Sequence, residues 1–90
     1  MKATRLLIEG IVQGVGFRYF TERAARKLGA RGHVRNLPDG SVEAVVVAQP
    51  DQVRALLEEL RRGPRAARVR QVTTSEIDLA DEPLGFEIRP

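Results

Sequence analysis

The strongest structural signal in this chain is a glycine-rich stretch at positions 10–18, GIVQGVGFR. An apolar, β-branched run over residues 4–12 leads into it, and a helical pattern of side chains follows Arg18. Glycine permits positive φ angles and lets backbone amides approach a ligand closely. A helix that starts here adds unpaired N–H groups and partial positive charge. The stretch therefore predicts a strand-loop-helix unit that, with the Arg18 guanidinium, binds a small tetrahedral anion such as a phosphoryl group.

Two nucleotide-binding motifs do not fit this stretch. A dinucleotide fingerprint, G-x-G-x-x-G, would need glycine at position 19, where Tyr19 stands. A Walker A loop would need a Gly-Lys pair, and the chain has none. A small phosphorylated compound is therefore favoured over ATP or NAD. Taken alone, the stretch also fits a tight strand-to-helix turn whose glycines serve backbone geometry only.

The rest of the chain alternates strand and helix patterns. Apolar residues recur with helical spacing in two segments, first at Phe20, Ala24 and Leu28 and later at Val53, Leu56, Leu57 and Leu60. A Pro-Asp-Gly turn at 38–40 joins two strand-like runs, 32–37 and 41–47, into a hairpin. Further strands are expected at 67–77 and, briefly, around 86–88.

This order, β-α-β-β-α-β with a short extra C-terminal strand, predicts an α+β fold. The expected architecture is a ferredoxin-like α/β sandwich, in which an antiparallel sheet carries both helices on one face. Ninety residues, 42% of them hydrophobic, are enough for one domain over residues 1–90 with a core of its own.

Composition limits the chemistry that the chain can perform. The sequence has no cysteine and a single histidine, His33, which excludes thiol catalysis and a zinc site built on several imidazoles. No cofactor or metal is expected. No apolar run approaches the ~20 residues that span a bilayer, and the N-terminus lacks a signal-peptide pattern, so a cytoplasmic protein without membrane association is expected.

Arginine supplies 13 of the 15 basic residues, and the formal net charge is +3. A chain poor in Asn, Met and Cys and rich in ion-pairing residues fits a thermophilic source, and an Arg-rich, Lys-poor balance equally fits a GC-rich genome. One group of arginines could form a nucleic-acid patch, although a solvated face is favoured: Arg61, Arg62, Arg65, Arg68 and Arg70.

A second motif, GHVRNLPDGSVE at 32–43, joins the first in resembling the acylphosphatase family, as do Gly63-Pro64 and the ending GFEI at 85–88. The resemblance implies the ferredoxin-like fold and hydrolysis of carboxyl-phosphate anhydrides to a carboxylate and inorganic phosphate. It places the family's phosphate-binding arginine on Arg18 and its water-positioning asparagine on Asn36. His33 departs from the tryptophan that is common at that position, which bears on local packing.

The chemistry of these residue types agrees with the implied roles. Arg18 can offer a planar fork to two phosphate oxygens, and Asn36, whose amide both donates and accepts, can orient a water. The phosphate-binding segment is expected to comprise Gln13, Gly14, Val15, Gly16, Phe17 and Arg18. His33 is interpreted as a sheet residue rather than a general base, and the aromatic residues after Gly16 as packing anchors.

The first hypothesis is thus a monomeric, cofactor-free enzyme that hydrolyses small acyl phosphates by in-line attack of water. The alternative is a non-catalytic module that binds phosphate or acyl phosphate, because similar domains occur in larger carbamoyl-transfer proteins. RNA binding is a third and weaker hypothesis, since the strand run 41–47 has no aromatic side chain on which bases could stack.

Overall fold

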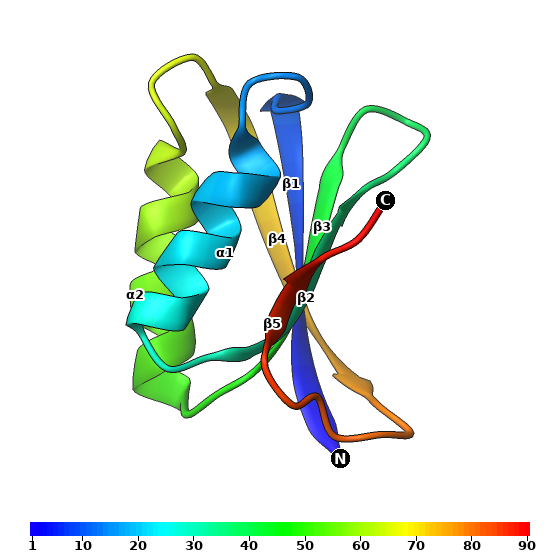
Figure 1. Cartoon of the computed structure of the whole chain (residues 1–90). Coiled ribbons are helices and arrows are strands. Elements are labelled where there is room, and N and C mark those ends of the chain that lie inside the picture. Colours follow the sequence, from blue (N-terminus) through cyan, green and yellow to red (C-terminus); the bar gives the residue numbers. More distant parts are fainter.

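The computed structural model describes residues 1–90 as a five-stranded sheet with two helices on one face (Figure 1). The elements follow in the order β1 (Lys2–Ile11), α1 (Phe17–Lys27), β2 (Arg31–Asn36), β3 (Val42–Val47), α2 (Pro50–Arg62), β4 (Arg68–Asp78) and β5 (Phe86–Ile88). The expected order of helices and strands is confirmed, and so is the ferredoxin-like arrangement. Pro50 occupies the first turn of α2, as its fixed φ angle favours.

The strands lie in the order β4-β1-β3-β2-β5. The four longer strands are antiparallel neighbours, in agreement with the expected sheet. The short strand β5 adds to the outer edge of β2 in parallel orientation, so the five-stranded sheet is mixed. This parallel pairing carries the C-terminal residues back toward the end of the sheet at which β2 ends, where the β1–α1 loop also lies (Figure 1).

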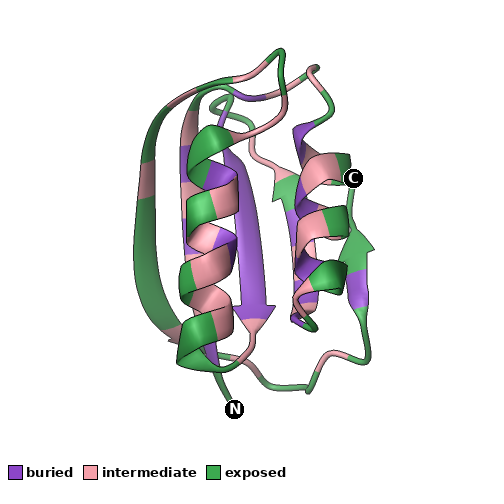
Figure 2. Ribbon diagram, turned by 90° about the vertical axis from the view of Figure 1, so that its left-hand side faces the viewer, coloured by how far each residue is buried: buried purple, intermediate pink, exposed green.

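The hydrophobic core lies between the sheet and the two helices (Figure 2). Alternate residues of β1 point into it, and Leu6 and Ile8 are fully buried. Leu56 and Leu60 of α2 meet them from the helical layer, with no exposed surface. A single cluster of 13 buried residues thus holds the sandwich together.

The face that α1 turns to the core includes the apolar stripe that its spacing indicated and is wider than that stripe. Phe20, Ala24 and Leu28 are partly buried and pack against the core cluster, and Phe17, Thr21 and Ala25 beside them are fully buried. The helix begins two residues earlier than expected, which brings Phe17 into the core with 1% exposure. The hydroxyl of Thr21 donates to the Phe17 carbonyl oxygen at 2.9 Å, so a polar residue is tolerated in this buried stripe.

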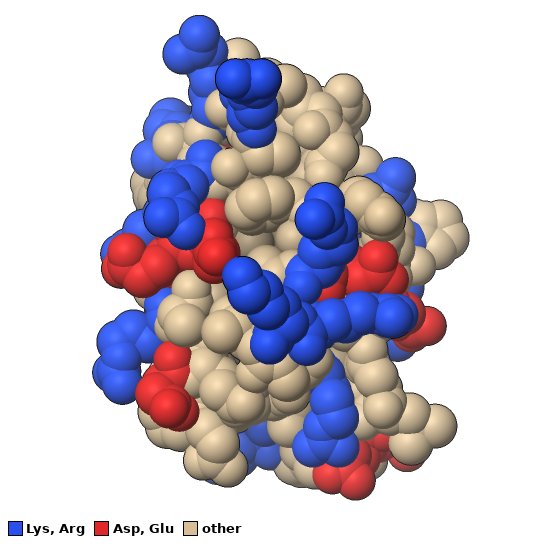
Figure 3. All heavy atoms as spheres, turned by 60° about the vertical axis from the view of Figure 1, so that its left-hand side comes forward, with Lys and Arg blue, Asp and Glu red and all other residues tan.

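The surface carries interspersed charges of both signs. Figure 3 shows acidic groups set among the basic side chains on the face that it presents. Three of the five arginines considered as a nucleic-acid patch have acidic partners, namely Arg61 with Glu58, Arg62 with Glu59 and Arg70 with Glu9. Neither helix combines the length and apolar character that crossing a membrane requires.

Candidate active site

The loop between β1 and α1 makes its turn at two glycines. Gly14 and Gly16 have φ angles of +74° and +79°, in the left-handed region that other residues enter at a cost. A Cβ at either position would meet no atom within 4 Å. The glycines are therefore required by the backbone conformation and not by crowding, and they leave the loop open to a ligand.

Gly16 is also the residue from which α1 starts. Its carbonyl oxygen accepts the first helical hydrogen bond, from the Phe20 amide at 3.0 Å. No side chain caps this end of the helix, and its first turn contains no acidic residue. The leading amides and the positive end of the helix dipole are consequently free to bind an anion.

The loop, the end of β2 and the C-terminal segment enclose a small cleft of about 190 Å³. Arg18 and Asn36 both line it, although 18 positions separate them in the sequence. The full lining is Val12, Gly14, Gly16, Phe17, Arg18, Tyr19, Asn36 and Ile88. The structure therefore gathers five of the seven residues expected at the site around one cavity.

The side chains of the other two expected residues lie elsewhere. Val15 is half-buried and packs against the hydrophobic core. Gln13 turns away toward the β2–β3 hairpin, where its Nε2 donates to the Leu37 and Ser41 carbonyl oxygens. Gln13 and Val15 therefore contribute only backbone groups to the loop that contains Gly14 and Gly16.

The C-terminal segment contributes groups that sequence reasoning missed. Ile88 lines the cleft, and the Arg18 Nη1 donates to the carbonyl oxygen of Arg89 at 2.9 Å. The Arg89 amide in turn donates to the Val34 carbonyl oxygen, which extends the pairing of β5 with β2. A backbone carbonyl has no signature in the side-chain pattern, so no sequence signal could have identified this partner.

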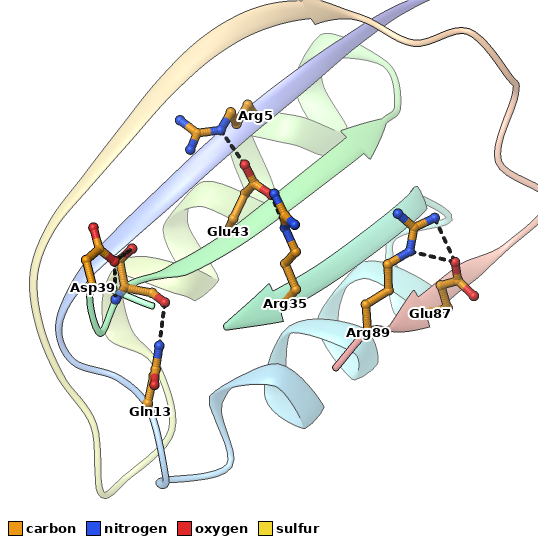
Figure 4. Close-up of polar contacts among 8 residues, drawn as sticks. Arg5, Gln13, Arg35, Asp39, Glu43, Glu87 and Arg89 are labelled. Atoms are coloured by element: carbon orange, nitrogen blue, oxygen red, sulfur yellow. Dashed lines mark hydrogen bonds and ion pairs between the residues drawn. The ribbon is translucent and has the colours of Figure 1, made fainter. Parts of the chain in front are cut away.

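A group of charged residues lies on the face of the sheet that the helices leave uncovered (Figure 4). Glu43 of β3 accepts from Nε of Arg5 at 2.5 Å and from Nε of Arg35 at 2.7 Å. Burial by itself would raise the pKa of Glu43, but the hydrogen bonds from the two guanidinium groups outweigh it and hold the pKa below its ordinary value. This arrangement stabilises the sheet and lies outside the cleft.

His33 also lies outside the cleft. It is half-buried on β2, where it stands opposite Val45 on one side and Glu87 on the other. Burial, together with the nearby positive charge of Arg89, lowers the pKa of the imidazole below 6.5. No group of three or more His, Asp or Glu side chains gathers anywhere in the chain in a way that could hold a metal ion.

Fold and site together define a small α/β sandwich protein with a cleft of about 190 Å³ at one end of its sheet, lined by one arginine and one asparagine. A family model described as Acylphosphatase matches residues 4–88. The acylphosphatase of Methanocella arvoryzae is 47% identical over 89 residues, which cover 99% of this chain and 100% of that protein. The chain belongs to the acylphosphatase family.

Solved structures show the same likeness. The crystal structure of acylphosphatase from Bacillus subtilis superimposes with a TM-score of 0.93 at 30% identity and is matched over 100% of both chains. HypF from T. kodakarensis contains a similar region, with a TM-score of 0.89 at 36% identity, which covers 99% of this chain and 12% of that one. The fold therefore occurs both as a chain of this size and as a part of a much larger protein.

Proposed function

We propose that this acylphosphatase hydrolyses small acyl phosphates with Arg18 as the phosphate ligand and Asn36 as the residue that positions water. The observation that carries the proposal is the convergence of these two side chains on one cleft. The uncapped start of α1 and the loop amides from Gln13 to Arg18 supply further donors for the phosphoryl group.

Each group has a distinct part in the proposed reaction. The planar guanidinium of Arg18 offers two parallel N–H donors to phosphate oxygens, and the loop amides stabilise charge that develops on them. The Asn36 side chain accepts a hydrogen bond from a water and holds it in line with the scissile P–O bond. A bond from the water oxygen to phosphorus forms as the P–O bond to the acyl group breaks, and the carboxylate leaves with the electron pair.

The chemistry of the leaving group explains how so few groups suffice. A carboxylate has a pKa of about 4, so its departure gains little from protonation by a general acid. The proton that the water gives up passes to an oxygen of the substrate's own phosphoryl group. We therefore expect the rate to be independent of added divalent metal and insensitive to EDTA.

Two largely apolar side chains border the cleft where the acyl group of a bound substrate would extend out of it. Tyr19 lines the cleft and is 60% exposed, and Ile88 lines it with 36% exposure. Exposed apolar surface beside a polar anion site suits a substrate that is charged at one end and apolar at the other. This supports acyl phosphates with an apolar or aromatic acyl group as substrates.

We further propose that residues 1–90 act as a single-domain, cytoplasmic monomer that binds no nucleic acid. The single core cluster supports the single domain, and the acidic partners of Arg61, Arg62 and Arg70 argue against a nucleic-acid surface. Light scattering of the purified chain would test the monomer, and a dimeric mass at micromolar concentration would contradict it.

The decisive experiment measures phosphate release from benzoyl phosphate, with and without EDTA. We expect turnover that EDTA does not change. Asn36→Ala should lower kcat about 100-fold, as loss of a well-placed polar group does, while the inhibition constant of inorganic phosphate stays within about twofold. Arg18→Lys should raise that inhibition constant about tenfold, because a lysine cannot reproduce the bidentate fork.

Gln71→Ala serves as a matched control, because Gln71 is exposed on β4 and its amide donates only to Thr73. This variant should leave kcat and the inhibition constant of inorganic phosphate unchanged. A folded wild-type chain that binds phosphate but releases none from benzoyl phosphate would contradict the enzymatic activity. The non-catalytic binding module would then be the remaining hypothesis. An active chain with unchanged kcat after Asn36→Ala would remove Asn36 from its proposed role.

A further inference from the structure

The side chain of Gln13 joins the two segments that carry the proposed catalytic groups. Its Nε2 donates to the Leu37 carbonyl oxygen at 2.7 Å and to the Ser41 carbonyl oxygen at 2.8 Å. Leu37 and Ser41 lie 24 and 28 positions further along the chain. Figure 4 shows the side chain reaching from the loop to the hairpin beside Asp39.

These two hydrogen bonds use the whole donor capacity of the Gln13 side chain. A primary amide has two N–H groups, and both are directed at the hairpin. None is left for a phosphoryl oxygen in the cleft, whose lining does not include Gln13. The side chain therefore has a different role from the anion binding expected of the loop.

The carbonyl groups that Gln13 contacts are the ones that close the hairpin turn. The Leu37 amide donates to the Ser41 carbonyl oxygen at 2.9 Å, and the Gly40 amide donates to the Leu37 carbonyl oxygen at 3.2 Å. The Asp39 carboxylate accepts from the amide and the hydroxyl of Ser41. Gln13 thus braces a turn that is already hydrogen-bonded within itself, and it does so from outside the hairpin.

Asn36 immediately precedes this turn. It is the last residue of β2, opposite Val42, and Leu37 is the next residue in the chain. On the other segment, Gln13 immediately precedes Gly14, where the loop bends toward the cleft. The Gln13 side chain consequently connects the loop of Gly14 and Gly16 to the turn that follows Asn36. A displacement of about 1 Å between such groups can cost on the order of 100-fold in rate.

We propose that Gln13 is a positioning residue: its side chain clamps the Leu37–Ser41 turn to the β1–α1 loop and so aligns Asn36 with the phosphoryl group. The inference rests on the proposed roles of Arg18 and Asn36. It assigns the Gln13 side chain to the alignment of water, whereas its backbone amide remains part of the loop.

The test is a double-mutant cycle in the chain of residues 1–90 between Gln13→Met and Asn36→Ala, with benzoyl phosphate as substrate and inorganic phosphate as inhibitor. Methionine keeps the length of glutamine and lacks its donors. We expect Gln13→Met to lower kcat about tenfold or more and to change the phosphate inhibition constant less than twofold. In the Asn36→Ala background, the same substitution should lower kcat less than twofold further, because its effect acts through Asn36.

Three results would overturn the inference: an unchanged kcat, a phosphate inhibition constant that rises as much as kcat falls, or losses that multiply in the double variant. Gln71→Met, on exposed β4, is the matched control and should change nothing. If Asn36→Ala alone has no effect, Asn36 loses its proposed role, and the premise of this inference fails with it. If Asn36→Ala is slow and Gln13→Met is fully active, the role of Asn36 stands and only the role of Gln13 is overturned.

Amide hydrogen exchange gives a readout that needs no turnover. The Leu37 and Gly40 amides donate within the braced turn, so their exchange should be at least tenfold faster in Gln13→Met. Amides of the β1–β4 pairing serve as the internal reference for global stability. Unchanged exchange at Leu37 and Gly40 would show that Gln13 does not hold the turn. If Gln13→Met does not fold, Gln13→Ala is carried through the same measurements.

Discussion

The guanidinium of Arg18 donates a hydrogen bond to the backbone carbonyl oxygen of Arg89, across 71 positions of the chain. One N–H group of the proposed phosphate ligand is thereby held by the C-terminal segment, which fixes the direction in which the remaining donors point. The contact exists because β5 runs parallel to β2 and delivers residues 88 and 89 to the cleft.

Removing this partner should weaken phosphate binding. A chain that ends after Ile88 loses the Arg89 carbonyl, and we expect the phosphate inhibition constant to rise about fivefold, equivalent to about 1 kcal/mol for a partly exposed charged hydrogen bond. A chain that ends after Arg89 keeps the neutral carbonyl oxygen and should bind phosphate as tightly as the chain of residues 1–90. Both truncated chains are made with an amidated C-terminus, so that neither places a carboxylate beside the cleft. Equal inhibition constants for the two truncated chains would contradict the role of the Arg89 carbonyl.

Tyr19 should influence the choice of acyl group. Its exposed ring borders the cleft, and the Arg23 guanidinium lies 5.8 Å from the ring centre. We expect Tyr19→Ala to raise KM for benzoyl phosphate about fivefold through loss of about 1 kcal/mol of aromatic contact. KM for acetyl phosphate should change less than twofold. An equal rise for both substrates would place the effect on the phosphoryl group and contradict contact with the acyl group.

Gly16→Ala tests the conformation of the loop. At a φ of +79° an alanine costs about 1 kcal/mol, and no neighbouring atom stands in its way, so the variant should fold. Phosphate affinity should fall roughly tenfold because the relaxed loop misplaces its amides. Gly29→Ala is the control: its φ is +76° at the other end of α1, outside the cleft, and its Cβ would meet only Nε2 of the Gln52 side chain, at 3.3 Å. It should lose similar stability in urea denaturation and keep full activity.

Glu43→Gln should reduce stability at neutral pH by about 2 kcal/mol, because Arg5 and Arg35 lose the carboxylate that they share. The pKa of Glu43 in the folded chain lies below its ordinary value of 4.5. Its contribution is therefore complete above about pH 4.5 and is lost as the pH falls through the folded pKa. Urea denaturation should show a smaller difference in the free energy of unfolding between wild type and Glu43→Gln at pH 3 than at pH 7.

Glu9→Gln provides the comparison for this prediction. Glu9 forms a looser ion pair with the exposed Arg70, at 3.4 Å, and its removal should cost less than about 0.5 kcal/mol. A difference for Glu43→Gln that persists at pH 3 would mean that packing, and not charge, supplies the stabilisation.

His33→Gln should leave the pH dependence of kcat/KM unchanged between pH 5 and 8, because His33 does not line the cleft. Stability should respond differently. The lowered pKa of His33 means that folding favours the neutral imidazole, so its contribution is complete above about pH 6.5 and is lost as the pH falls through the folded pKa. The melting temperature of His33→Gln should therefore lack the part of the pH dependence that His33 contributes in the wild-type chain. A displaced limb in the pH–rate profile would show that His33 titrates in the reaction.

Several features could be predicted from the residues alone because they depend on short stretches of chain. Helix and strand periodicities, the Pro-Asp-Gly turn and the proline that starts α2 predicted the element order and the ferredoxin-like sandwich, both of which the structure confirms. The two motifs identified the family and singled out Arg18 and Asn36, which meet in one cleft. Their roles in turnover remain a prediction.

Local spacing was less informative about how one element faces another. The stripe of Phe20, Ala24 and Leu28 does pack against the core, but the fully buried residues of α1 are Phe17, Thr21 and Ala25, which the spacing did not single out. The apolar period alone does not reveal where a helix starts, and the start at Phe17 adds a buried aromatic side chain that the expected helix lacked.

By itself the sequence determined which segments become helices and strands, because backbone preferences and hydrophobic periods act over a few residues. Only the tertiary structure decided that β5 would pair in parallel with β2 and that the Arg89 carbonyl oxygen would accept a hydrogen bond from Arg18. It also decided that the Gln13 side chain would donate to the hairpin and not to an anion in the cleft. These contacts join residues 24 to 71 positions apart. They depend on backbone carbonyl groups, which every residue carries, and their positions follow from the packing of the whole sheet.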